Sequence, residues 1–81
     1  MSAKSEKKKQ EWLKIFGKYI RTIRLERSLT GSDFGALINM EKGNVSRLEA
    51  GKINPSTYAL KQICDGLDLT LEEFWNGFMS K

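Results

Sequence analysis

Residues Thr30–Ser56, TGSDFGALINMEKGNVSRLEAGKINPS, carry the pattern that decides the fold. Thr30 is followed three residues later by Asp33, which is a capping-box pattern with Asp in place of the usual Glu. It predicts a short helix over Gly31–Ile38. Asn39 comes next, and it predicts the end of that helix because asparagine tolerates a left-handed conformation.

A second short helix is predicted over Lys42–Ala50. Val45 and Leu48, together with Met40 just before the helix, are expected to face inward. Gly51 predicts a left-handed helix end. Two short helices joined by a tight turn have the geometry of a helix-turn-helix, whose first helix packs across the DNA backbone and whose second enters the major groove.

Helices are predicted on both sides of this pair. From about Glu6 to Arg27 a long amphipathic helix is expected, with these apolar residues at helical spacing: Trp12, Ile15, Phe16, Tyr19, Ile20 and Ile23. Ser56 caps a fourth helix, and Thr70 with Glu73 forms a full capping box that opens a fifth. No segment alternates with period two over a useful length, so the fold class is all-α with five helices.

The predicted core and domain limits follow from these helices. Residues 1–10 are expected to form a basic, frayed N-terminal arm, 11–78 the domain, and 79–81 a C-terminal tail. Cys64 is expected to be a small buried apolar residue. The expected core consists of Phe16, Ile20, Ile23, Leu29, Phe34, Leu37, Ile38, Val45, Leu48, Leu60, Ile63, Leu67, Leu71 and Phe74.

Composition excludes several classes of protein. The 81 residues hold no histidine and one cysteine, which excludes a histidine base, a zinc cluster and a disulfide framework. We therefore expect no enzyme, no metal, no cofactor and no small-molecule ligand. No apolar run approaches the roughly 20 residues of a membrane helix, and no apolar block follows the basic N-terminus as in a secretory signal. A cytoplasmic location is expected.

The positive charge is concentrated at one end of the chain. Fourteen Lys and Arg face ten Asp and Glu, a net charge of +4. Residues 1–30 alone hold nine basic residues against three Glu, whereas residues 61–81 hold two against four acids. This asymmetry indicates either a side that faces a polyanion or a solvated lysine tail on an ordinary surface. The run Lys4–Lys9 is expected to be a solvated arm, with non-specific phosphate contacts as the alternative.

The chain resembles the Cro/repressor-type (XRE-like) helix-turn-helix family over about residues 13–76. The resemblance is most specific in Ser46–Pro55, SRLEAGKINP. It also includes FGKYIRTIR at 16–24, the pairs Leu29-Thr30 and Phe34-Gly35, and the last two helices. The resemblance implies a compact lambda-repressor-like fold, with the second and third helices as the helix-turn-helix.

That resemblance also implies a function. Members of the family bind double-stranded DNA, usually as two-fold dimers on palindromic operators, so we expect a homodimeric transcriptional regulator, bacterial or phage-type and nucleoid-associated. Arginine and lysine can read guanine, and asparagine can read adenine. Helix-start amides bind phosphate readily. The expected base-reading positions are Arg47, Lys42, Asn44 and Gly43, and the expected backbone contacts are Gly31, Ser32, Ser46, Lys52 and Asn54.

Two further pairs of residues receive structural roles. The resemblance implies a buried ion pair between Arg24 and Glu49 that ties the first helix to the end of the recognition helix. Trp75 and Phe78 are candidate dimer contacts, with the core as the alternative. Trp12 is expected to cover the fifth helix or to join a dimer contact.

Three residues depart from the family pattern. Gly31 replaces the glutamine that commonly starts the first motif helix, Gly43 has no side chain to read a base, and Glu41 places an acid near the DNA. They support an alternative function, a protein-interaction module or antitoxin-like partner with weak or lost DNA binding. A phage or mobile-element repressor, a restriction–modification controller and an antitoxin-like autoregulator all fit the small size.

Overall fold

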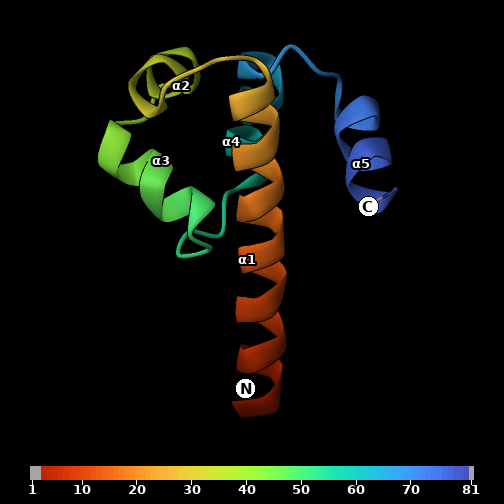
Figure 1. The fold of residues 1–81 in the computed structure, drawn as a ribbon. Coiled ribbons are helices and arrows are strands. Elements are labelled where there is room, and N and C mark those ends of the chain that lie inside the picture. Colours follow the sequence, from red (N-terminus) through yellow and green to blue (C-terminus); the bar gives the residue numbers. More distant parts are fainter. Residues whose placement is uncertain (1–2, 81) are drawn as a thin grey trace.

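The computed structural model describes residues 3–80, and within that range every regular element is an α-helix (Figure 1). The all-α, five-helix prediction is therefore confirmed. The helices are α1 (Ala3–Glu26), α2 (Gly31–Ile38), α3 (Lys42–Glu49), α4 (Thr57–Gly66) and α5 (Leu71–Met79).

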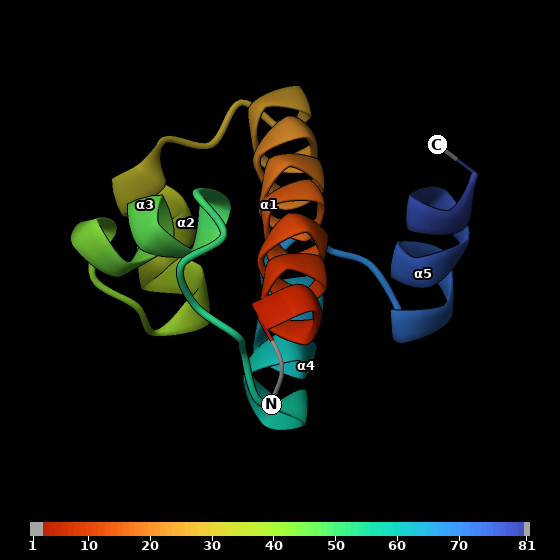
Figure 2. The ribbon, with the colours of Figure 1, turned by 90° about the horizontal axis from the view of Figure 1, so that it is seen from below.

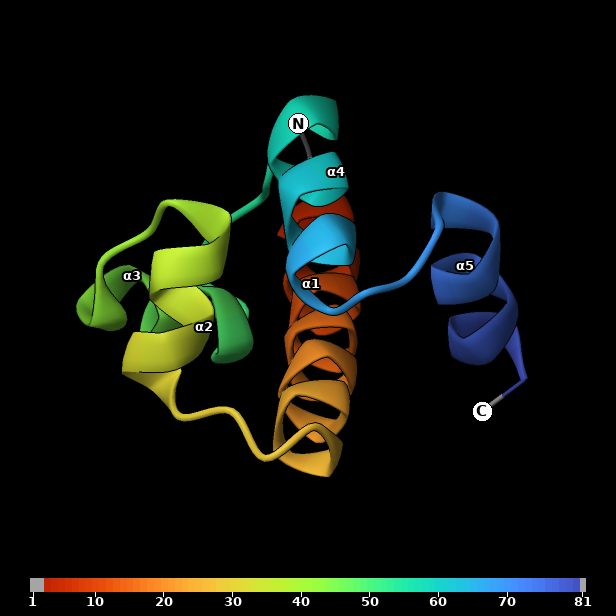
Figure 3. The same cartoon turned by 90° about the horizontal axis from the view of Figure 1, so that it is seen from above.

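The long helix α1 stands at the centre of the molecule. Views from below and from above show α2 and α3 on one side of α1 and α5 on the other (Figures 2 and 3). Helix α3 packs against α1, while α2 packs against both α3 and α4. The helix-turn-helix and α5 therefore occupy separate faces of one scaffold.

The predicted helix boundaries form as local capping structures. Thr30 accepts a bond from the Asp33 amide while the Asp33 carboxylate accepts one from the Thr30 amide, and Thr70 and Glu73 repeat this arrangement. Asn39 adopts φ 60°, as expected for a left-handed helix end. These caps satisfy backbone groups that a helix end otherwise leaves without partners.

The N-terminal helix is longer than predicted. Helix α1 begins at Ala3 rather than near Glu6, so residues 3–10 continue the helix. Helix α5 likewise runs to Met79, one residue past the expected domain limit. Residues 1, 2 and 81 of the expected arm and tail lie outside the described residues, and the division into arm, domain and tail stays a prediction.

Most of the predicted core is buried, with two errors. Leu37 is 57% exposed and Leu71 is 45% exposed. Leu37 points away because Phe34 and Ile38, four residues apart, form the inward face of α2. Leu71 lies in the first turn of α5, on its solvent side. Leu29 and Leu60 are only partly buried, and the core also takes in Leu13 and Tyr19, two residues that the predicted core omits.

Candidate nucleic-acid interface

The angle between α2 and α3 is fixed at Gly35. The Asn39 and Met40 amides both donate to the Gly35 carbonyl oxygen, so the chain turns tightly over this residue. A Cβ built on Gly35 would lie 3.4 Å from the Val45 side chain and closer still to the Met40 carbonyl oxygen. A glycine is required here because any side chain would push the two helices of the motif apart.

Helix α3 has one buried face and one exposed face. Val45 and Leu48 are almost completely buried against the core. Five residues on the other face of the helix are exposed: Lys42, Gly43, Asn44, Ser46 and Arg47. The structure therefore brings the four expected base-reading positions together on one outward surface.

The basic side chains of this surface are available to a ligand. Lys42 and Arg47 make no ion pair or side-chain hydrogen bond within residues 3–80, and neither does Asn44. Positions 43, 44 and 47 share a helical face because they are three and four residues apart. The guanidinium of an exposed arginine on such a face is free to make two hydrogen bonds to one guanine.

The expected backbone contacts flank this surface. Gly31 and Ser32 open α2, and a Cβ on Gly31 would lie 3.7 Å from the Lys42 side chain, so the starts of α2 and α3 are adjacent. Lys52 and Asn54 are exposed in the loop that follows α3. Anion-binding amides at one end of α3 and a loop lysine at the other form two contact regions around the outward surface.

An ion pair holds α3 to α1. Arg24 Nε donates to Glu49 Oε2 at 2.6 Å and Arg24 Nη2 donates to Glu49 Oε1 at 3.0 Å. Hydrogen bonding to Glu49 raises the pKa of Arg24 above its ordinary value. The pair expected between these two residues therefore forms, with both side chains about 90% buried.

Sequence reasoning missed a second contact between the same helices. A Cβ on Gly17 would lie 2.6 Å from the Glu49 carbonyl oxygen, so the backbone of α1 rests directly on the last turn of α3. The signal in the sequence is only an unremarkable glycine within a helix. The orientation of the exposed α3 surface depends on this contact and on the Arg24–Glu49 pair.

The opposite side of α1 carries an aromatic cluster with α5. Tyr19 donates from its hydroxyl to the Phe74 carbonyl oxygen at 2.7 Å. Trp12, expected either to cover the fifth helix or to join a dimer, meets Phe78 edge to face at a centroid distance of 5.2 Å. Trp75 and Phe78 are half-buried against the core rather than fully exposed.

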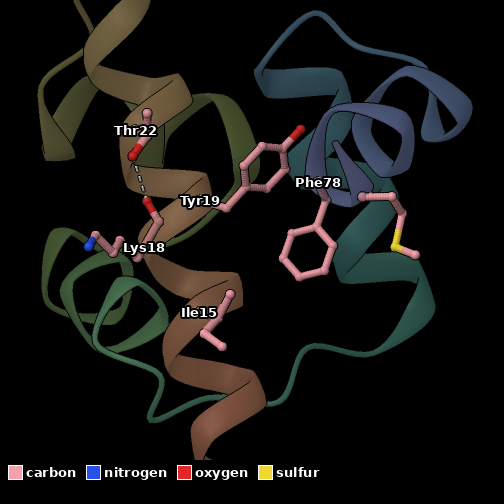
Figure 4. Close-up of a pocket in the computed structure, with 6 residues that line it drawn as sticks. Ile15, Lys18, Tyr19, Thr22 and Phe78 are labelled. Atoms are coloured by element: carbon pink, nitrogen blue, oxygen red, sulfur yellow. Dashed lines mark hydrogen bonds between the residues drawn. The ribbon is translucent and has the colours of Figure 1, made fainter. Parts of the chain in front are cut away.

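A shallow apolar hollow of about 510 Å³ lies beside this cluster (Figure 4). Ile15, Tyr19 and Thr22 of α1 face Phe78 across it, and Lys18 and Met79 complete its lining. Ile15 and Met79 are among the most exposed large apolar side chains in the described residues. Exposed apolar area of this kind is typical of an interaction surface.

Other kinds of site find little support in residues 3–80. No group of three or more His, Cys, Asp or Glu side chains in that range is placed to hold a metal ion. No helix there has both the length and the apolar character to cross a membrane. Burial raises the pKa of the Cys64 thiol to about 11, so Cys64 packs as a neutral core residue.

Known proteins match both the sequence and the fold. Residues 15–74 match the model of a family described as helix-turn-helix domain. A single-residue variant of the restriction–modification controller protein C.Esp1396I is similar in structure, with a TM-score of 0.78, 25% identity, and coverage of 84% of this chain and 86% of that chain. The clp gene regulator ClgR from Corynebacterium glutamicum is also similar in structure, with a TM-score of 0.75 and 19% identity. The match covers 83% of this chain and 86% of that chain. No curated protein sequence matches significantly.

Proposed function

We propose that this chain, which belongs to the helix-turn-helix domain family of DNA-binding transcriptional regulators, recognises a specific double-stranded DNA operator through α3. The observation that carries the proposal is the outward surface of α3, where Arg47, Lys42 and Asn44 are exposed beside Gly43 and have no ion pair among the described residues 3–80. The side chains that major-groove recognition uses most are thus presented by the helix that this motif inserts.

We assign base reading first to Arg47. Its guanidinium can donate to both O6 and N7 of a guanine. Lys42 is the second base contact or a phosphate contact, because it lies at the start of α3 beside the start of α2. Asn44 reads an adenine or donates to a phosphate, and Gly43 lets the DNA approach the helix closely.

The phosphate contacts are assigned to the flanks of α3. Gly31 and Ser32 offer backbone amides at the start of α2, and Ser32 adds a hydroxyl. Ser46, Lys52 and Asn54 contact the backbone from the exposed side of α3 and from the following loop. Such contacts set the register of a protein on DNA, whereas the α3 side chains select the sequence.

A repressor or autoregulator is the form of regulation we propose. The solved structures described above belong to a clp gene regulator and to a restriction–modification controller protein, and in both the match spans 86% of the compared chain. A regulator of this kind acts through its own concentration and dimerisation. Its place would be on nucleoid DNA in the cytoplasm.

A homodimer on a palindromic operator is proposed through the α5 side. Helix α5 and the helix-turn-helix lie on opposite sides of α1, so a two-fold contact at α5 leaves both copies of α3 free (Figures 2 and 3). Phe78 lines the apolar hollow and Trp75 borders the same cluster, which supports them as contact residues. The two α3 helices would then lie about 34 Å apart, one turn of DNA.

A protein-interaction or antitoxin-like role without DNA binding is the second candidate function. It is favoured by Glu41, an exposed acid that starts α3 without a side-chain capping bond, and by the open space around Gly43. The carboxylate of Glu41 would repel DNA phosphates, and Gly43 has no side chain with which to contact a base.

A salt titration of binding to random duplex DNA distinguishes the two functions. If the protein binds DNA, the logarithm of the association constant falls linearly with the logarithm of salt concentration, with a slope of about −0.9 per phosphate contacted. Phosphates neutralised by lysine or arginine set this slope, and Lys52 with Lys42 supplies such charges at the flanks of α3, so the affinity should fall as salt is added. No binding at low salt, or binding that is independent of salt, would contradict DNA recognition and favour the interaction module.

A further inference from the structure

A second hollow, of about 450 Å³, lies between the N-terminal half of α1 and the loop that follows α3. Lys9 and Lys14 line it from α1, and Lys52 lines it from the loop. Glu6 is its single acidic residue. Lys52 is already assigned to the phosphate contacts that flank α3, whereas Glu6, Lys9 and Lys14 lie outside them, so the hollow would extend that contact region along α1.

The hollow is rigidly tied to the recognition helix. Gly51 adopts φ 79°, and a Cβ built on it would lie 2.7 Å from the Lys14 backbone, so loop and helix are in direct contact. The Lys52 amide donates to the Arg47 carbonyl oxygen at 2.9 Å. The backbone at Lys14 and Lys52 is therefore held in place against the last turns of α3.

The charge of the hollow favours an anion. Three ammonium groups face one carboxylate, and within residues 3–80 neither Lys14 nor Lys52 makes an ion pair. Lys9 and Glu6 lie 3.8 Å apart with both side chains 45% exposed. An exposed pair of that kind contributes little free energy, so Lys9 can turn to a stronger partner.

The spacing of the lysines suits a sugar-phosphate backbone. Lys9 and Lys14 are separated by about 7.5 Å along the axis of α1. That distance is close to two base-pair steps of DNA at about 3.4 Å each. The N-terminal half of α1 continues well past the loop that follows α3, so its lysines extend beyond the helix-turn-helix (Figure 1).

We propose that this hollow is a second phosphate-binding surface, which holds the backbone of the same DNA duplex that α3 enters. The inference rests on the proposed function and extends it, because it lengthens the DNA contact from the helix-turn-helix to the N-terminal half of α1. It gives Lys9, Lys14 and Lys52 a common task, and it makes Glu6 a charge that weakens binding.

The test compares substitutions of one kind on two faces of α1. Lys9→Gln and Lys14→Gln remove charge from the hollow, and Glu6→Gln removes its acid. Lys8→Gln is the matched control, because Lys8 neighbours Lys9 in sequence but lies on the face of α1 turned away from the loop. Each variant is titrated with salt on a random duplex, and circular dichroism checks that its helix content and thermal unfolding match the parent protein.

The expected result is selective. Lys9→Gln and Lys14→Gln each reduce the salt slope by about 0.9. Glu6→Gln strengthens binding, whereas Lys8→Gln leaves the slope unchanged. If Lys8→Gln and both lysine variants of the hollow showed the same salt slope, the proposal of a second phosphate-binding surface would be overturned. DNA recognition by α3 would be unaffected. Failure of the parent protein to bind any duplex would overturn the proposed function itself. Binding of inorganic phosphate by the hollow without any change in DNA slope would also overturn the shared-duplex proposal.

Discussion

Arg24 connects three segments of the chain, and its main partner is Glu49. Its guanidinium donates two hydrogen bonds to the Glu49 carboxylate, and Nη1 donates a third to the Leu29 carbonyl oxygen at 2.8 Å. The first helix, the connection to α2 and the last turn of α3 thus meet at one buried cation. Because α3 carries the proposed base-reading side chains, this pair determines how they are presented.

Removal of one member of this pair should destabilise the fold strongly. Glu49→Ala leaves the Arg24 guanidinium buried without its carboxylate, and the expected loss is about 3–5 kcal/mol in the free energy of unfolding. Urea denaturation measures it. Glu41→Ala is the control, because Glu41 is exposed without a capping bond and its loss should change stability by less than about 0.5 kcal/mol. A Glu49 variant of normal stability that has lost DNA affinity would mean that the pair acts on DNA directly.

Two glycine substitutions should act in opposite directions. Gly17→Ala places a methyl group against backbone oxygens of α3, which cannot move aside, and should destabilise by about 1–3 kcal/mol. Gly43→Ala has nothing within 4 Å and should stabilise by less than about 1 kcal/mol, because alanine favours the helix but Gly43 lies in its first turn. Thermal unfolding compares the two. If both variants shifted the melting temperature equally, the close contact of α1 with α3 would be contradicted.

The Thr70–Glu73 capping box should add a pH dependence to stability. The hydrogen bonds from Thr70 lower the pKa of Glu73 below its ordinary value. The carboxylate therefore contributes stability that is fully present above the pKa of the unfolded chain, about 4.3, and is lost as pH falls through the lower folded value. Urea denaturation at about pH 6 and about pH 3 should show that the advantage of the parent protein over Glu73→Gln shrinks in acid. A difference that stays constant with pH would refute this role.

Cys64 should resist thiol reagents in the folded protein. Burial, the main cause, and the nearby Asp65 together raise its pKa to about 11, so little thiolate exists near neutral pH. A disulfide reagent should therefore react only as fast as the protein opens, and much faster in denaturant. Rapid labelling of the native protein at neutral pH would contradict a purely structural role.

The local signals in the sequence were sufficient for the helix ends. Thr30, Ser56 and Thr70 all cap helices as predicted, because a capping side chain reaches only its own first turn. Ser28-Leu29 is also the predicted end of the first helix, but the left-handed conformation of Ser28 and of Asp68, each with φ 58°, was not predicted. Neither is a glycine, and local hydrogen bonds close each helix end, because the Leu29 amide donates to the Arg24 carbonyl oxygen and the Leu69 amide donates to the Cys64 carbonyl oxygen.

Contacts between helices were harder to predict from the sequence than the helices themselves. In the eight residues of α2, Leu37 and Ile38 are adjacent apolar residues, and only the packing of α2 on α4 leaves Leu37 in solvent. Gly17 gave no signal because close approach between backbones has no side-chain pattern. The candidate interface was more accessible to prediction: exposed residues at fixed spacing on α3 follow from helix geometry once the helix is placed. Their contacts with DNA stay predictions.

Selection of bound duplexes from random DNA, carried out on the parent protein and on Arg47→Ala, tests DNA reading by α3 most directly. The parent protein should enrich a palindrome whose half-sites are centred about 34 Å, or roughly 10 base pairs, apart. Arg47→Ala should relax the preference at one base position in each half-site, at a cost of about 1–3 kcal/mol. Recognition through this helix would be contradicted if the parent protein enriched no sequence. It would also be contradicted if Arg47→Ala enriched the same sequence with undiminished preference.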